Sequence, residues 1–101
     1  MSELAVWATI DVLPGRQAEA EEVFARSRRV LEAEPGTTSF FVVRIDDTTY
    51  GIFDTFADRA ALEAHIEGDS GRDHVNSLVG SVFAAPPVIT TATLVERAAT
   101  G

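Results

Sequence analysis

The stretch "TTSFFVVRIDDTTYGIFDTF", residues 37–56, decides which fold this chain can adopt. Residues 37–45 and 49–56 are two runs rich in β-branched and aromatic side chains, the types that favour strands. The short segment between them, "DDT" at residues 46–48, is typical of a tight turn. We therefore predict a β-hairpin at the centre of the chain.

Further strands are predicted on both sides of the hairpin. Residues 4–13 carry apolar side chains at every second position, and Pro14 and Gly15 end this pattern. Residues 88–96 follow Pro86 and Pro87 and form a last predicted strand, and residues 97–101 are predicted to be a frayed tail. Together with the hairpin, these segments predict a sheet of four strands.

Helical periodicity fills the two gaps between the predicted strands. In residues 16–34 the apolar side chains recur at three- and four-residue spacing, and "PG" at residues 35–36 stops the helix. A second helix begins at Asp58 and runs to about Glu67, where Gly68 interrupts it. The residues that predict a further helix by their spacing are Val75, Leu78, Val79, Val82 and Phe83. The order βαββαβ, with its second helix divided, predicts a single α+β domain of the ferredoxin-like type with an antiparallel four-stranded sheet.

Apolar side chains occupy both faces of the predicted strands. In residues 37–45, for example, Phe41 and Val43 point away from the face that carries Phe40 and Val42. A sheet with one face in water should instead alternate between apolar and polar residues. We therefore expect a second copy of the chain to cover the face away from the helices, which gives a two-fold homodimer.

The composition argues against several classes of partner. The chain has 101 residues and a formal net charge of −8, so neither a nucleic acid nor an anionic membrane, both of which need a basic face, is an expected partner. The absence of cysteine excludes disulfides and thiolate metal ligands. No apolar run approaches the length of a membrane span and no signal-peptide pattern is present, so the expected location is the cytoplasm.

A second stretch, "HIEGDSGRDH" at residues 65–74, holds the Gly-Asp-Ser-Gly tetrapeptide of trypsin-like proteases between two histidines. A chain of this length has no room for the two-barrel scaffold that such a nucleophile requires. We interpret the stretch as a helix junction, in which Gly68 adopts a left-handed conformation and Ser70 caps the next helix by accepting from the backbone N–H of Asp73. The alternative is a metal site formed by His65, Asp69 and His74.

Three stretches resemble the antibiotic biosynthesis monooxygenase family, whose members form dimeric α+β barrels. They are "EAEPGTTSFFVVR" at residues 32–44, "TYGIFDTFADRAALEAHIEG" at residues 49–68 and "AAPPVITTATLVE" at residues 84–96. They match the family's helix-ending Glu-Pro-Gly, its strand that ends in an acidic and an aromatic residue, and its helix with Ala-His. The resemblance spans residues 4–96. It implies a homodimer that oxygenates polyphenols or quinols without a cofactor or degrades haem, and some members of the family have no known activity.

Haem degradation is disfavoured by the residues at the matching positions. The haem-degrading members combine an Asn on the first strand with a Trp and a His on the later helices. In this chain Ala8 is near the Asn position, His65 stands where the Trp would lie, and His74 is displaced from the His position. The resemblance therefore favours the reaction that uses neither a metal nor an organic cofactor.

Oxygenation of this kind needs a base, an apolar pocket and a donor for the developing oxyanion. Our candidate base is His65, because histidine exchanges protons near neutral pH, and Asp54, which replaces the family's usual Glu, is the candidate to orient it. The candidate substrate-binding residues are Trp7, Phe40, Tyr50 and Phe53 as pocket walls and Arg44 or Asn76 as phenolate donors.

Simpler interpretations of the same residues remain open. Arg44 and Asp54 can form a structural ion pair across the hairpin, and the aromatic side chains can belong to the core rather than to a pocket. The whole protein can also be a non-catalytic homodimer that binds a small aromatic ligand. The residues alone do not decide between an enzyme and this binding protein.

Overall fold

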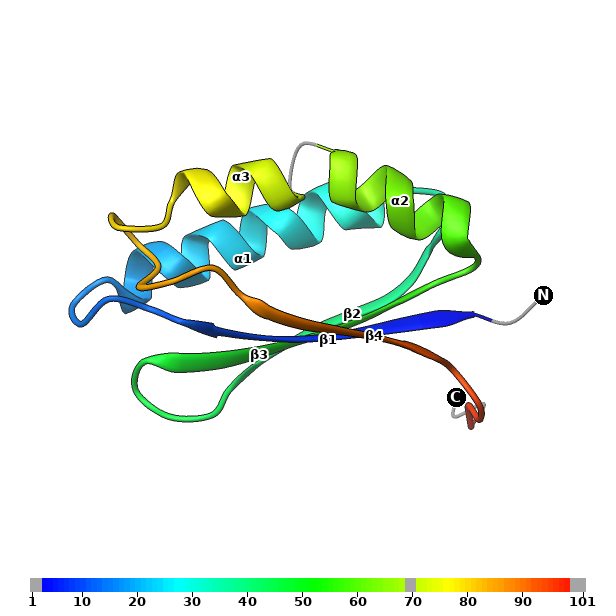
Figure 1. Ribbon diagram of the computed structural model, residues 1–101, viewed down its shortest axis with the longest axis horizontal. Coiled ribbons are helices and arrows are strands. Elements are labelled where there is room, and N and C mark those ends of the chain that lie inside the picture. Colours follow the sequence, from blue (N-terminus) through cyan, green and yellow to red (C-terminus); the bar gives the residue numbers. More distant parts are fainter. Residues whose placement is uncertain (1–2, 69–70, 99–101) are drawn as a thin grey trace.

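Strands and helices follow one another in the order that the sequence predicts (Figure 1). The computed structural model describes residues 3–68 and 71–98. Its elements are β1 (Leu4–Asp11), α1 (Gln17–Glu32), β2 (Thr37–Arg44), β3 (Thr49–Phe56), α2 (Arg59–Glu67), α3 (Arg72–Ser77) and β4 (Val88–Thr93). This order confirms the ferredoxin-like α+β fold with a divided second helix. Within these two ranges, no helix has both the length and the apolar character needed to cross a membrane.

The strands form one antiparallel sheet in the order β2-β3-β1-β4. The central hairpin of β2 and β3 is closed by Asp46, whose carboxylate accepts two backbone N–H groups of the turn at 3.0 and 2.8 Å. β1 lies between β3 and β4, so that Val6 is paired with Asp54 on one side and with Thr91 on the other. The helices cover one face of this sheet (Figure 1).

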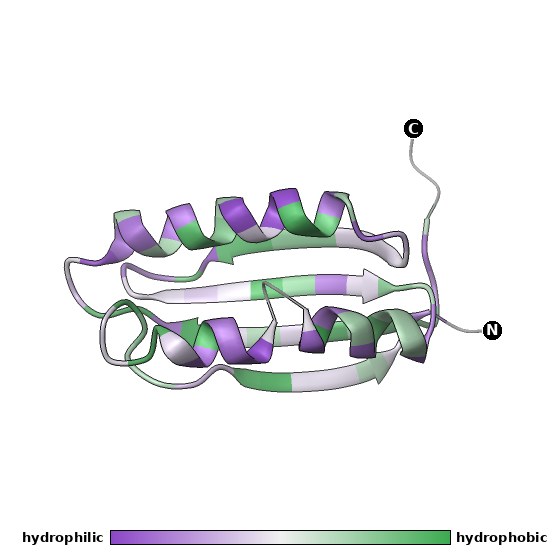
Figure 2. Cartoon of the chain, turned by 90° about the horizontal axis from the view of Figure 1, so that it is seen from above, coloured by the Kyte–Doolittle hydropathy of each residue, from purple (hydrophilic) through white to green (hydrophobic). Residues whose placement is uncertain are grey.

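Two apolar clusters lie between the helices and the sheet. Seen from above, α1 runs along one side of the molecule while α2 and α3 lie end to end along the other (Figure 2). The first half of α1 packs Phe24 against Tyr50 and Phe83, with ring centroids 5.2 and 6.0 Å apart. The last turn of α1 places Leu31 in a second cluster with Val6, Phe56 and Leu62. The core is therefore divided along the length of α1.

The third helix is shorter than the apolar spacing predicts. α3 ends at Ser77, and the chain then turns at Gly80, where φ is +94°. The Gly80 N–H donates to the carbonyl oxygen of Phe83 at 2.8 Å, and Phe83 bridges to Val12 beside β1. Val82 and Phe83 are buried as the pattern requires, but a tight turn rather than a helix buries them.

The junction of α2 and α3 also differs in detail from the prediction. Asp58 caps α2 as expected, with its carboxylate 2.9 Å from a backbone nitrogen of the first turn. Gly68 at the end of α2 is extended, with φ −83° and ψ −175°, so the predicted left-handed conformation is wrong. The N-cap residue of α3 is Gly71, and Ser70, the predicted cap, lies outside the described residues.

The face of the sheet opposite the helices carries large apolar side chains in contact with water. Trp7, Phe41, Val43 and Val88 are 40, 59, 48 and 70 % exposed. The Trp7 ring lies over Gly51, where a Cβ would collide with it. The pattern of two apolar faces predicted from the strands is therefore present in the fold. We call this helix-free side the open face.

Candidate functional site

A cavity of about 410 Å³ lies between the sheet and the helices. Strand residues of the helix-covered face line it from one side, and α1, α2 and α3 line it from the other. Both core clusters contribute to the wall, so the cavity interrupts the core between them. Its volume falls in the range of small-molecule sites. The side chains with charged, imidazole or amide groups among its lining are Asp54, His65, Arg72 and Asn76.

The geometry of α2 places the candidate base in this wall. Leu62 on α2 packs into the core. His65 follows one turn later on the same side of the helix, so it also faces the sheet, and its side chain is 16 % exposed. The imidazole stacks on Phe56 with ring centroids 5.3 Å apart. A Cβ at Gly71 would collide with the carbonyl oxygens of His65 and the next residue, so glycine is needed for α3 to approach α2 this closely.

Asp54 lies beside His65 in the same wall. Its Oδ2 is 3.8 Å from His65 Nε2, which is too long for a hydrogen bond, and its buried Oδ1 has no hydrogen-bond partner among the described residues. Burial raises the pKa of this carboxyl from 3.8 to about 7, and the negative charge of Glu34 adds to the rise against the opposing effect of the Asp54 backbone N–H. The carboxyl therefore keeps its proton to a higher pH than an exposed aspartate does.

Glu34 is a third member of this group, and our interpretation of the sequence gave it no role. Its Oε2 lies 3.4 Å from His65 Nδ1 and accepts a hydrogen bond from the Thr37 hydroxyl at 3.1 Å. The feature of the sequence that could have predicted this position is the Glu-Pro-Gly turn at residues 34–36, which directs the chain from the end of α1 toward α2. At this turn Gly36 approaches Ala61 so closely that a Cβ would collide. The imidazole thus lies between two carboxyl groups.

Two of the predicted substrate-binding residues lie in the same cavity. Phe40 on β2 is paired with Asp54 on β3 and lines the apolar wall next to it. Asn76 on α3 lines the opposite, helical side and brings an amide group to the cavity. Four predicted site residues, His65, Asp54, Phe40 and Asn76, are therefore brought together.

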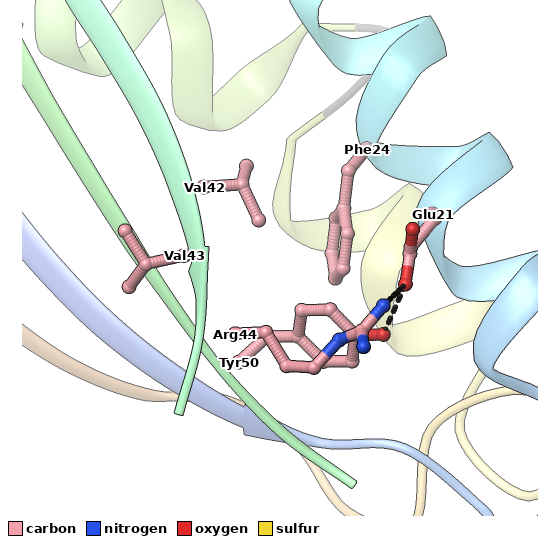
Figure 3. Close-up of a pocket in the computed structure, with 6 residues that line it drawn as sticks. All are labelled: Glu21, Phe24, Val42, Val43, Arg44 and Tyr50. Atoms are coloured by element: carbon pink, nitrogen blue, oxygen red, sulfur yellow. Dashed lines mark hydrogen bonds and ion pairs between the residues drawn. The ribbon is translucent and has the colours of Figure 1, made fainter. Parts of the chain in front are cut away.

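Arg44 and Tyr50 belong to a different pocket, of about 370 Å³, beside α1 and the hairpin (Figure 3). Glu21 Oε2 accepts a hydrogen bond from the Tyr50 hydroxyl at 2.6 Å and from Arg44 Nη2 at 2.7 Å. The Arg44 guanidinium also lies 5.9 Å from the centroid of the Tyr50 ring. The proposed pairing of Arg44 with Asp54 is wrong, because α1 supplies a carboxylate that is closer to Arg44.

The pKa values of Glu21 and Tyr50 in this second pocket are shifted by the hydrogen bonds between them and Arg44 and by burial of the Tyr50 hydroxyl. The hydrogen bonds from Tyr50 and Arg44 lower the pKa of Glu21 below its usual value of 4.5. Burial raises the pKa of the Tyr50 hydroxyl, and its bond to Glu21 adds to that rise. The group therefore consists of a neutral phenol, a carboxylate and a guanidinium that are bonded to one another.

Trp7 and Phe53 lie on the open face and do not line either pocket. Their neighbours Val6, Ala8, Ile52 and Asp54 line the cavity, and successive strand side chains point to opposite faces. Trp7 and Phe53 are directly paired across β1 and β3. They are available to a partner on the open face rather than to a ligand beneath the helices.

The metal alternative finds no support in the part of the chain that the structure describes. Among residues 3–68 and 71–98, no group of three His, Asp or Glu side chains is arranged to hold a metal ion. Asp69, a member of the predicted metal set, lies outside those residues.

Comparisons with known proteins agree on the fold and the family. A family model described as "Antibiotic biosynthesis monooxygenase" matches residues 4–77. None of the curated proteins matches this sequence.

Solved structures match over nearly the whole chain. A protein of unknown function from Nitrosomonas europaea is 28 % identical, with a TM-score of 0.88, and the match covers 100 % of this chain and 97 % of that one. A "putative antibiotic biosynthesis monooxygenase" from Caulobacter crescentus CB15 is also 28 % identical, with a TM-score of 0.82 and coverage of 94 and 92 %. A Mycobacterium tuberculosis protein at 20 % identity, with a TM-score of 0.82 and coverage of 97 and 100 %, shares the fold.

Proposed function

This chain belongs to the antibiotic biosynthesis monooxygenase family, and from that premise we propose that it is a monooxygenase that uses no cofactor and acts on a small hydroxyaromatic or quinol-type substrate. The observation that carries the proposal is the largely apolar cavity whose wall holds a half-buried histidine next to a buried carboxyl. Such a site can hold an electron-rich ring away from water and beside a group that takes its hydroxyl proton.

In the proposed reaction His65 takes the proton of the substrate hydroxyl, and the phenolate transfers one electron to O₂. The phenoxyl radical and superoxide then combine through a new carbon–oxygen bond, which gives a ring peroxide. Loss of water from this peroxide leaves a quinone. One oxygen atom of O₂ stays on the ring and the other leaves as water, whose two hydrogens come from the substrate.

Each proposed role rests on a position in the cavity. The carboxyl groups of Asp54 and Glu34 lie on either side of His65 and stabilise the charge that the imidazole acquires with the proton. The amide of Asn76 is the proposed donor to the developing oxyanion. Phe40 and the other apolar side chains hold the ring. Arg44, which pairs with Glu21, has no role in this reaction.

Aerobic turnover of a panel of quinols and polyphenols, followed by O₂ consumption, tests the proposal. We expect at least one compound to be consumed by the wild type, and His65→Ala to lower kcat by about 10²–10⁴-fold, as expected for loss of a general base. His74→Ala is the matched control, because His74 lies on α3 and does not line the cavity. Equal turnover by His65→Ala and wild type would rule out the role of the base.

A non-catalytic binding protein is the second candidate function. It is favoured by the 3.8 Å distance between His65 Nε2 and Asp54 Oδ2, because a base and its orienting carboxylate are hydrogen-bonded in an assembled catalytic pair. If no panel compound is consumed while aromatic ligands still raise the melting temperature, this second function replaces the first.

The proposed assembly is a homodimer in which the open faces of two subunits meet. Its support is the exposure of Trp7, Phe41, Val43 and Val88 on that face, since large apolar patches mark interaction sites. Light scattering at micromolar concentration should give twice the subunit mass, and Phe41→Glu should give the monomer. Ala18→Glu, an equal charge change at an exposed position of α1, should leave the dimer intact. A monomeric wild type would contradict the dimer.

A further inference from the structure

The buried carboxyl of Asp54 leaves a hydrogen-bonding position in the cavity wall that the described residues do not fill. The Asp54 side chain is only 6 % exposed, and within residues 3–68 and 71–98 its Oδ1 has no hydrogen-bond partner. A buried carboxyl whose hydrogen bonds are incomplete is costly, so the group calls for a donor. Its second oxygen, Oδ2, lies 3.8 Å from His65 Nε2, so one oxygen atom of a ligand can lie at a hydrogen-bond distance of about 2.8 Å from both Oδ2 and Nε2. A hydroxyl group, which both donates and accepts, fits this position.

The charges around this position are unfavourable for an anion. Asp54 is on one side of His65, and the carboxylate of Glu34 lies 3.4 Å from the other side of the imidazole. The cavity lining includes one arginine among the described residues, Arg72, whose side chain is 63 % exposed and lies 3.7 Å from Asp73. That guanidinium is exposed to water, where its charge is screened. A ligand carboxylate placed beside Asp54 would thus lose its hydration without gaining a buried cation.

The remainder of the cavity favours an aromatic ring. Aliphatic and aromatic side chains line it, among them Ile10 on β1, Phe24 on α1, Val75 on α3 and Phe83 in the turn that follows α3. Together these features define a largely apolar space with a hydrogen-bonding position between Asp54 and His65 in its wall.

We propose that this cavity selects uncharged aromatic compounds with a hydroxyl group, which binds between Asp54 and His65, and that Asp54 and Glu34 reject analogues with a carboxylate in its place. The inference rests on the proposed function only for the location of the site. It adds that the ligand binds in its uncharged state and that Asp54 and Glu34 determine this specificity.

Calorimetric titration of the full-length protein with 2-naphthol and 2-naphthoate at about pH 8 tests this selection, because the naphthol is then neutral and the naphthoate ionised. We expect 2-naphthol to bind at least about tenfold more tightly than 2-naphthoate, as like-charge contacts give discrimination of this order. Equal or tighter binding of 2-naphthoate would overturn the inference. So would the absence of binding by 2-naphthol at millimolar concentration.

Charge-removing variants assign the selection to the two acids. Asp54→Asn and Glu34→Gln should each bring the ratio of the two affinities closer to one. Glu63→Gln removes the same charge from an exposed position of α2, two residues before His65, and should keep the wild-type ratio. An unchanged ratio of affinities in both Asp54→Asn and Glu34→Gln would overturn the assignment. If Asp54→Asn does not fold, Glu34→Gln, at a position with 25 % side-chain exposure, still decides it.

The outcomes separate this inference from the proposed function. Selective binding of 2-naphthol together with no turnover of any quinol would refute the oxygenase and support the binding selectivity. Turnover of a quinol together with equal affinity for 2-naphthol and 2-naphthoate would support the oxygenase and refute the binding selectivity.

Discussion

Two carboxyl groups near the same strand, Glu21 beside Tyr50 and Asp54 further along β3, have opposite surroundings. Glu21 is close to water and accepts from both Tyr50 and Arg44. Asp54 is buried, has one oxygen without a partner in the described part of the chain, and lies near a second acid, Glu34. The pKa is lowered in the first group and raised in the second. A satisfied group of this kind holds a fold together, whereas an unsatisfied one in a cavity indicates a binding site.

The largest expected effect of this difference is on the pH dependence of stability. Because the folded-state pKa of Asp54 is raised from 3.8 to about 7, the folded chain holds the proton more tightly than the unfolded chain. The free energy of unfolding should therefore fall as pH rises from about 4 to about 7, by roughly 4 kcal/mol at most. Asp54→Asn should remove this part of the decrease, which denaturant unfolding at about pH 5 and pH 8 will measure.

Glu21→Gln is the comparison for that measurement. The pKa of Glu21 is lowered, so its contribution to stability is present above the unfolded value of 4.5 and is lost as pH falls. This variant should keep the wild-type decrease between the two pH values. The same decrease in Asp54→Asn as in the wild type would show that ionisation of Asp54 is not costly.

A smaller effect is expected from Gly71→Ala, which alters the cavity that contains Asp54 and leaves the Glu21 group unchanged. The new Cβ would collide with the carbonyl oxygens of His65 and Ile66, so the junction of α2 and α3 must open. We expect a loss of roughly 1–3 kcal/mol of unfolding free energy together with weaker binding of 2-naphthol. Gly80→Ala, where φ is +94° and no atom is near, should lower stability but preserve binding. Full binding by Gly71→Ala would show that the junction does not position His65.

The smallest effect is expected from Tyr50→Phe on the Glu21 side. It removes one hydrogen bond and keeps the ring in the core, so the melting temperature should fall by about 5 °C or less. Binding of 2-naphthol should not change, because Tyr50 does not line the cavity. A marked loss of binding would mean that the two groups are coupled through the core.

Local patterns predicted the fold better than they predicted the site. The bounds of β3 were predicted to the residue, because turn residues and β-branched runs act over short distances. Helical spacing failed after Ser77, since a tight turn at Gly80 buries Val82 and Phe83 equally well. Periodicity indicates which residues are buried, but a short apolar segment can be buried without being helical.

The candidate site depends on contacts between distant segments. Alternation along β1 is sufficient to separate Trp7 from Val6 and Ala8, but only the sheet register shows that Phe40 lies beside Asp54. The partner of Arg44 is Glu21 on α1. The partner of His65 on α2 is Glu34, which follows the end of α1. Neither contact follows from residue spacing within one segment.

The position of Trp7 has a practical consequence for solution studies. It is the single tryptophan of the chain, and its indole lies over Gly51 on the open face, 40 % exposed and on the other side of the sheet from the cavity. Its fluorescence emission therefore reports on the surroundings of that face. If the proposed homodimer forms, its dissociation on dilution would shift the emission to longer wavelength, whereas filling of the cavity would leave the indole in the same environment.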